Sequence, residues 1–189
     1  MGSRPVLLSS SIVDLTYSAG RLSWPQGNTP GDGLGEAPAS CGRGGVRADK
    51  REGDGASPAG TFPLLRGFYR ADRVAPPATH LPMSALRLED AWVDDPADPN
   101  YNRLVTLPYP AHHEEMWRAD GLYDLVVLIG YNTDPPLPGR GSAIFLHVAA
   151  PNWARPDFAP TAGCIAVARE VLGPLLGLLG PGSMITIAP

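Results

Sequence analysis

Two apolar segments in the second half of the chain give the clearest structural signal. Residues 123–131 (YDLVVLIGY) form an almost continuous apolar run, which is typical of a strand buried on both faces. Residues 141–149 (GSAIFLHVA) alternate and are rich in branched and aromatic side chains, as strands are. The segment between them (NTDPPLPG) reads as a rigid turn. We therefore predict a central strand over 123–131 with an antiparallel neighbour over 141–149.

Weaker patterns predict the other elements. Strands are expected over residues 11–24 (two strands around a turn at 18–20), 61–70 (interrupted at Gly67) and 183–187. Loops are expected over residues 28–45 and 50–60, which are rich in glycine, and one or two helical turns over 111–118 (AHHEEMWR). A helix is expected over 167–179, bent at Gly173–Pro174. It would face the core with Val171, Leu172, Leu175, Leu178 and Leu179.

Composition favours a mainly β protein of one domain, residues 1–189. The chain has 22 glycines and 22 prolines, which suits many short strands joined by turns and disfavours a helical bundle. With 43% hydrophobic and 18% charged residues, the chain has the composition of a globular protein. A net charge of −4 gives no reason to expect nucleic acid as a partner. No apolar run approaches the length of a membrane span.

A histidine and a cysteine carry the candidate chemistry. His147 ends the predicted strand 141–149, and Cys164 follows it by 17 positions (164 − 147). Between them, residues 151–160 (PNWARPDFAP) contain three prolines and cannot continue the strand, so the chain loops out and returns. This return can bring Cys164 beside His147, where an imidazole takes the thiol proton and leaves a thiolate nucleophile. A helix starting just downstream would lower the thiol pKa.

Metal sites are not expected. Residues 112–115 (HHEE) lack the i, i+4 histidine pair of a zinc helix, and neighbouring side chains on a helix point in different directions. Asp94, Asp95 and Asp98 miss the spacing of a calcium loop. We therefore predict no metal and no cofactor.

The sequence resembles the L,D-transpeptidase catalytic domain family, also called the YkuD domain. That family has a histidine and, further along, Ser/Thr-His-Gly-Cys followed by an apolar residue and arginine. Here His147 and residues 161–166 (TAGCIA) match, and residues 57–62 (SPAGTF) match an upstream Thr-Pro-x-Gly-x-Phe segment. The resemblance covers roughly residues 45–187. Ala162 stands where many members have a second histidine, and Ala166 where many have the arginine.

The resemblance implies a β-sandwich or barrel with a helix beside the cysteine loop, and a cysteine acyltransferase acting on peptidoglycan stem peptides. Cys164 would be the nucleophile and His147 the base. The carbonyl of Val148 would orient His147, and the backbone N–H groups of Gly163 and Cys164 would stabilise the oxyanion. The alternatives are an L,D-carboxypeptidase that hydrolyses the same bond and a non-catalytic wall-binding domain.

Further expectations concern the substrate and the compartment. Thr161, Arg140 and Tyr131 are candidates for binding the substrate, and Arg155 and Arg169 are further cations that can replace the arginine missing at 166. Cys41 is expected to be unpaired, because Cys164 must stay free. The family implies the periplasm or cell envelope; residues 1–20 do not read as a secretory signal, so the cytoplasm stays an alternative.

Overall fold

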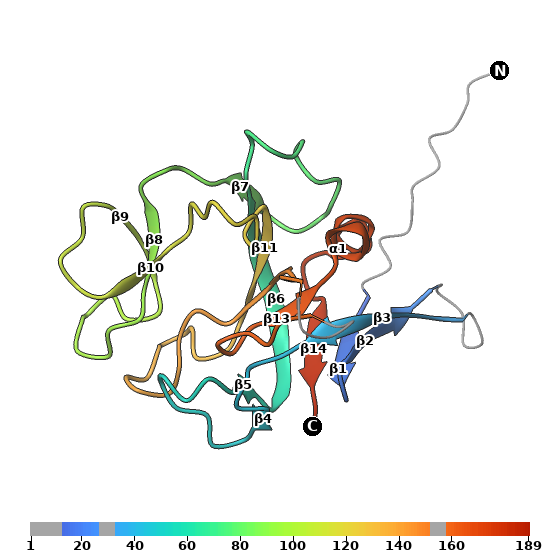
Figure 1. The fold of residues 1–189 in the computed structure, drawn as a ribbon, viewed down its shortest axis with the longest axis horizontal. Helices are drawn as coiled ribbons and strands as arrows, with labels where there is room; N and C mark the ends of the chain where they lie inside the picture. The colour runs from blue at the N-terminus through green and yellow to red at the C-terminus, as the bar shows by residue number, and fades with distance from the viewer. Residues whose placement is uncertain (1–12, 27–32, 152–157) are drawn as a thin grey trace.

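Most strands of the protein belong to one large sheet. The computed structural model describes residues 13–26, 33–151 and 158–189. In spatial order the strands are β11 (Leu125–Ile129), β12 (Phe145–Val148), β13 (Ile165–Val167), β3 (Leu34–Ser40), β2 (Arg21–Pro25), β1 (Leu15–Ser18), β14 (Met184–Ile187), β6 (Gly60–Tyr69) and β7 (Met83–Ala85). Because β11 also pairs with β6, the sheet closes on itself (Figure 1). The prediction of a mainly β, barrel-like fold is confirmed.

Two smaller sheets lie beside the large one. The first has three strands, β8 (Asp90–Val93), β9 (Leu104–Thr106) and β10 (His113–Glu115), with β8 in the middle. The second has two, β4 (Val46–Arg47) and β5 (Ser57–Pro58). In Figure 1 the three-stranded sheet lies on the left of β11 and β6, and the helix α1 (Arg169–Leu176) on the right. The strands between them are therefore covered on both sides.

The residues of β11 and β12 alternate between two hydrophobic cores. Val127 and Leu146 belong to the first core, which includes the leucines of α1. Val126 and Phe145 belong to the second core, together with Trp92 of the three-stranded sheet. This double burial explains the continuous apolar run of 123–131. The predicted antiparallel pairing with the segment 141–149 is confirmed, with Val126 opposite His147.

The helix is shorter than predicted and begins later. Residues 165–167, expected to lie at or next to its start, form β13, which pairs in parallel with β12. The helix runs without a break through Pro174, because Leu172, Leu175 and Leu176 fix it in the first core. Leu178 is 41% exposed, so its predicted core position is wrong. Within the described ranges, no helix has the length and apolarity to cross a bilayer.

Three other predictions are corrected. Part of the expected loop 28–45 is β3, which pairs with β2. Gly35 lies opposite Trp24 in this pair, and a Cβ on Gly35 would lie 2.3 Å from the Trp24 indole. The expected helical turns at 111–118 contain β10, because His113–Glu115 pair with β8. Strand β6 continues through Gly67, and its pairing with β11 shifts register just before that glycine.

Two predictions from the ends of the chain are confirmed. The strands expected over 11–24 are β1 and β2, joined at Ala19 and Gly20 with φ of 48° and 80°, and residues 11 and 12 lie outside the described residues. The strand expected over 183–187 is β14, which pairs in parallel with β1. Strands from both ends of the chain therefore lie side by side.

Candidate active site

A cavity of about 400 Å³ lies between the large sheet and the three-stranded sheet. Its walls come from residues 43–55, 114–123, 142–150 and 159–164, with Asp94 at one side. Both Cys164 and His147 line it. The structure thus brings the two predicted catalytic side chains to the same cavity from neighbouring strand segments.

His147 projects from the middle of β12 and is 5% exposed. Its Nδ1 lies 2.8 Å from the carbonyl oxygen of Val148, the contact expected to orient it. If Nδ1 carries the proton and donates to that oxygen, Nε2 is the basic nitrogen of the neutral ring. The ring also meets the Tyr123 ring edge-on, with 5.3 Å between centroids. Sequence neighbours and a packed aromatic therefore fix the imidazole on two sides.

Cys164 immediately precedes β13 and is 6% exposed. Its thiol donates to the carbonyl oxygen of Ala143 (3.2 Å), and its sulfur accepts a hydrogen bond from the N–H of Phe145 (3.4 Å). Phe145 is the first residue of β12 and Ala143 lies two positions before it, so the sulfur is aligned by the segment that leads into the strand carrying His147. Cys164 and Cys41 are both free, which confirms the prediction for Cys41.

Burial keeps both groups of the pair neutral. It raises the pKa of the Cys164 thiol to about 12, with the negative charge of Glu114 adding to the shift. It lowers the pKa of His147 to about 4. The helix was expected to lower the thiol pKa, but α1 begins only after β13, and burial dominates. The resting site therefore holds a thiol and an imidazole, not an ion pair.

A polar cluster beside His147 and Cys164 was missed from the sequence. The Tyr123 hydroxyl donates to Glu114 (2.6 Å), and the Arg118 guanidinium lies 3.5 Å from the same carboxylate. Burial raises the pKa of Glu114, while Tyr123 and Arg118 act against that shift. The sequence predicts helical turns over 111–118, at a polar surface or at the rim of the substrate cleft, and does not indicate which of these side chains meet. Instead, residues 113–115 pair with β8, and both Glu114 and Arg118 line the cavity.

The residues before Cys164 form a tight turn. The Thr161 hydroxyl donates to the Cys164 carbonyl (2.7 Å) and accepts from the Gly163 N–H (3.1 Å). Gly163 has φ of 152°, and a Cβ there would lie 2.9 Å from the Ala56 carbonyl oxygen. Among the described residues, no acceptor takes the Cys164 N–H. Of the two expected oxyanion donors, Gly163 N–H is thus bound to Thr161 at rest.

Only some of the residues predicted to bind the substrate line the cavity. Thr161 lines the cavity, whereas Arg140 and Tyr131 do not; the Tyr131 hydroxyl donates to the Arg140 carbonyl (2.6 Å). Arg169 forms an ion pair with Asp124, and Arg155 lies outside the described residues. Among the described residues, the cations that line the cavity are Arg43, Lys50 and Arg118.

The two departures from the family signature have different surroundings. Ala162 is exposed and lines the cavity. Ala166 is 1% exposed within β13, so its small side chain is part of the packed interior. No described group of three or more histidine, cysteine, aspartate or glutamate side chains is placed to hold a metal ion.

Comparison with known proteins points to one family. The family model described as the L,D-transpeptidase catalytic domain (YkuD) matches residues 12–187. Among solved structures, the chain is similar to Bdellovibrio bacteriovorus Bd1075, with 18% identity and a TM-score of 0.46 over 94% of this chain and 48% of that one. The chain spans about half the length of that protein. No curated protein matches the chain. The family match includes every strand described above, together with His147 and Cys164.

Proposed function

This chain belongs to the L,D-transpeptidase catalytic domain family, and we propose that it is a cysteine acyltransferase acting on peptidoglycan stem peptides. One observation carries the proposal: the Cys164 thiol and the His147 imidazole line one cavity. The family acts on peptidoglycan, and a thiol with a neighbouring base is what acyl transfer requires.

In the first step the basic Nε2 of His147 takes the proton of Cys164 while the sulfur attacks the donor carbonyl. The bond attacked joins the L-centre of diaminopimelate to the terminal D-alanine of a tetrapeptide. Because both groups are neutral at rest, the proton moves as the sulfur–carbon bond forms. His147 then gives that proton to the leaving nitrogen, and D-alanine departs from a thioester on Cys164.

The oxyanion formed during each attack requires donors that are already in place. The Cys164 N–H is our first candidate, because no described residue accepts from it. Gly163 N–H can join only by leaving the Thr161 hydroxyl. Removing one such donor typically costs about 3 kcal/mol of transition-state stabilisation.

The fate of the thioester distinguishes two activities. An amine of a second stem peptide would form a cross-link, making the protein an L,D-transpeptidase. Water would release a tripeptide, making it an L,D-carboxypeptidase. We favour the transpeptidase and place it in the periplasm or cell envelope, where stem peptides lie side by side; the hydrolase also suits recycling of wall fragments in the cytoplasm.

Purified disaccharide tetrapeptide tests the proposal. Mass spectrometry should detect dimer with the wild type, and none with Cys164→Ala. Cys41→Ala is the matched control, because it removes the other free thiol and should keep activity. Tripeptide without dimer would support the carboxypeptidase. A carbapenem should form a covalent adduct on Cys164; its absence, with no product from the tetrapeptide, would support the non-catalytic wall-binding domain.

A further inference from the structure

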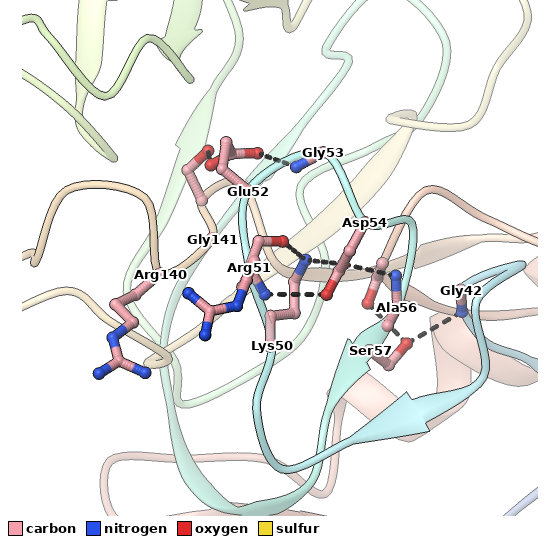
Figure 2. A network of polar contacts seen from close by, with 12 residues as sticks. Gly42, Lys50, Arg51, Glu52, Gly53, Asp54, Ala56, Ser57, Arg140 and Gly141 are labelled. Carbon is pink, nitrogen blue, oxygen red and sulfur yellow. Dashed lines mark hydrogen bonds and ion pairs between the residues drawn. The ribbon is translucent and has the colours of Figure 1, made fainter.

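Ser57 lies directly beneath the nucleophile turn, although the mechanism above does not use it. It is fully buried, with 0% exposure. Its hydroxyl donates to the Gly163 carbonyl oxygen at 2.7 Å and accepts a hydrogen bond from the Gly42 N–H at 2.9 Å. Figure 2 shows Ser57 between Ala56 and Gly42. One side chain therefore connects the 42–57 segment to the peptide that precedes Cys164.

The hydrogen bond to Gly163 determines where the Cys164 N–H points. The Gly163 carbonyl and the Cys164 N–H belong to the same peptide unit, which is planar and trans, so the two groups point in opposite directions. Fixing the carbonyl oxygen on Ser57 therefore fixes the direction of the N–H. A carbonyl that accepts a hydrogen bond also polarises the N–H of its own peptide.

We infer that Ser57 is a positioning residue for the oxyanion site, holding the Gly163–Cys164 peptide so that the Cys164 N–H faces the developing oxyanion. This inference rests on the proposed acyl transfer. It gives the segment 57–62 (SPAGTF) a role at the site, through the hydrogen bond from Ser57 to the Gly163–Cys164 peptide.

The neighbours of Ser57 keep it in place. Asp54 accepts hydrogen bonds from the Ala56 N–H and from the ammonium group of Lys50, both at 2.8 Å. Lys50 is itself 3% exposed, and Figure 2 shows its side chain turned toward Asp54. The Ala56 carbonyl lies against Gly163, where a Cβ would come within 2.9 Å. The support beneath the nucleophile turn is thus buried, bonded and closely packed.

Two reactions of the Cys164 sulfur can distinguish a positioning role of Ser57 from a general role in folding. Acylation by a carbapenem forms an oxyanion and needs the donor, whereas alkylation by iodoacetamide displaces iodide at a saturated carbon and forms none. Loss of an oxyanion donor costs about 100- to 1000-fold in rate. A donor that remains present but is misdirected should cost less, about 10- to 100-fold.

The experiment compares Ser57→Ala with Ser57→Thr, which keeps the hydroxyl. In Ser57→Ala the acylation rate should fall about 10- to 100-fold while alkylation stays within about twofold, and Ser57→Thr should restore acylation. Ser183→Ala is the matched control, because Ser183 is also 0% exposed and hydrogen-bonds to Gly180. It should leave both rates unchanged. If Ser57→Ala does not fold, Ser57→Val beside its isostere Ser57→Thr makes the same comparison.

Three results would overturn the inference. Wild-type acylation in Ser57→Ala or Ser57→Val would show that the hydroxyl does not position the donor. An equal fall in acylation and alkylation would make Ser57 a general support of the fold. If the wild type itself is not acylated although iodoacetamide alkylates Cys164, the proposed function fails along with the inference. The first two results leave the proposed function standing.

Discussion

Ala166 lies directly opposite His147 in the parallel pair of β12 and β13. It is 1% exposed, so the residue standing where many family members have arginine is enclosed by its neighbours. An arginine at this position would have to bury its charge or displace β13.

We expect Ala166→Arg to destabilise the fold by several kcal/mol, the typical penalty for an unpaired buried charge. The measurement is the urea midpoint of unfolding. Ala162→Arg is the matched control, because Ala162 is exposed at the cavity and should change stability by about 0.5 kcal/mol at most. Equal midpoints for the two variants would show that β13 accommodates the larger side chain.

The pH dependence of acylation should reflect the lowered pKa of His147, about 4. The base acts only when neutral, so the rate should fall with acid near that value. It should stay nearly constant from pH 5.5, about 1.5 units above that pKa, to pH 7.5. The measurement is the rate of carbapenem adduct formation at each pH. A resting thiolate–imidazolium pair would instead place the acid limb at the thiolate pKa and lose activity as the imidazolium deprotonates.

The same histidine should make the fold sensitive to acid. Its folded pKa of about 4 lies below its usual value of 6.5, so the unfolded state binds the proton first as pH falls. Stability is therefore complete above about pH 6.5 and is lost progressively down to about pH 4, by about 3 kcal/mol in total. His147→Gln cannot titrate and should lose less stability than the wild type over this window. The measurement is the free energy of unfolding of both proteins by chemical denaturation at pH 7 and at pH 4. An equal loss of stability in the wild type and in His147→Gln would contradict this account.

Arg43 should contribute to substrate affinity. It is exposed and lines the cavity, and none of the ion pairs formed within the described part of the chain includes it. A carboxylate of the stem peptide can therefore pair with it. We expect Arg43→Ala to raise the KM for tetrapeptide about 3- to 10-fold, or about 0.7–1.4 kcal/mol.

The matched control for Arg43 is Arg140→Ala, which removes the same charge from an exposed arginine that does not line the cavity. Figure 2 shows the Arg140 side chain outside the polar network around Lys50. Its KM should equal that of the wild type. The reverse pattern, with only Arg140→Ala affected, would support the candidate chosen from the sequence.

Asn102 should be important for stability. Its side-chain oxygen accepts hydrogen bonds from the Trp92 indole (2.8 Å) and from the Ala143 N–H (3.0 Å). Asn102→Ala would leave both buried donors unpaired, and we expect a loss of about 2–4 kcal/mol. Asn100→Ala, which removes a half-buried amide bound to Tyr109, should lose less than about 1 kcal/mol. Thermal unfolding that ranks the two variants equally would contradict this.

Local patterns in the sequence predicted β11 and β12, and β12 carries His147. The apolar run at 123–131 and the alternation at 141–149 could be recognised in the sequence because each strand buries its own apolar residues. The positions of His147 and Cys164 relative to the strands and the proline-rich loop then indicated that they can meet. Patterns of this kind depend only on residues close together in the sequence.

Features that depend on pairing between residues far apart in the sequence could not be predicted from it. Strand β3 consists of glycine, alanine and proline at most positions, and it is a strand because β2 and β13 pair with it. Glu114 reaches the cavity because β10 pairs with β8. The position of Ser57 beneath Gly163 joins residues 106 apart, and no local periodicity reports such a contact.

The pairing of β11 with β6 has a consequence for how the protein can be divided. His147 lies in β12 and Cys164 directly precedes β13, so both positions depend on a closed ring of strands whose ladders run in both directions around the molecule. The ring includes β1 and β14, from opposite ends of the described chain. Removing β1 or β14 would open this ring. We therefore expect that no fragment lacking either strand keeps the proposed activity, and that local unfolding of these strands lowers that activity.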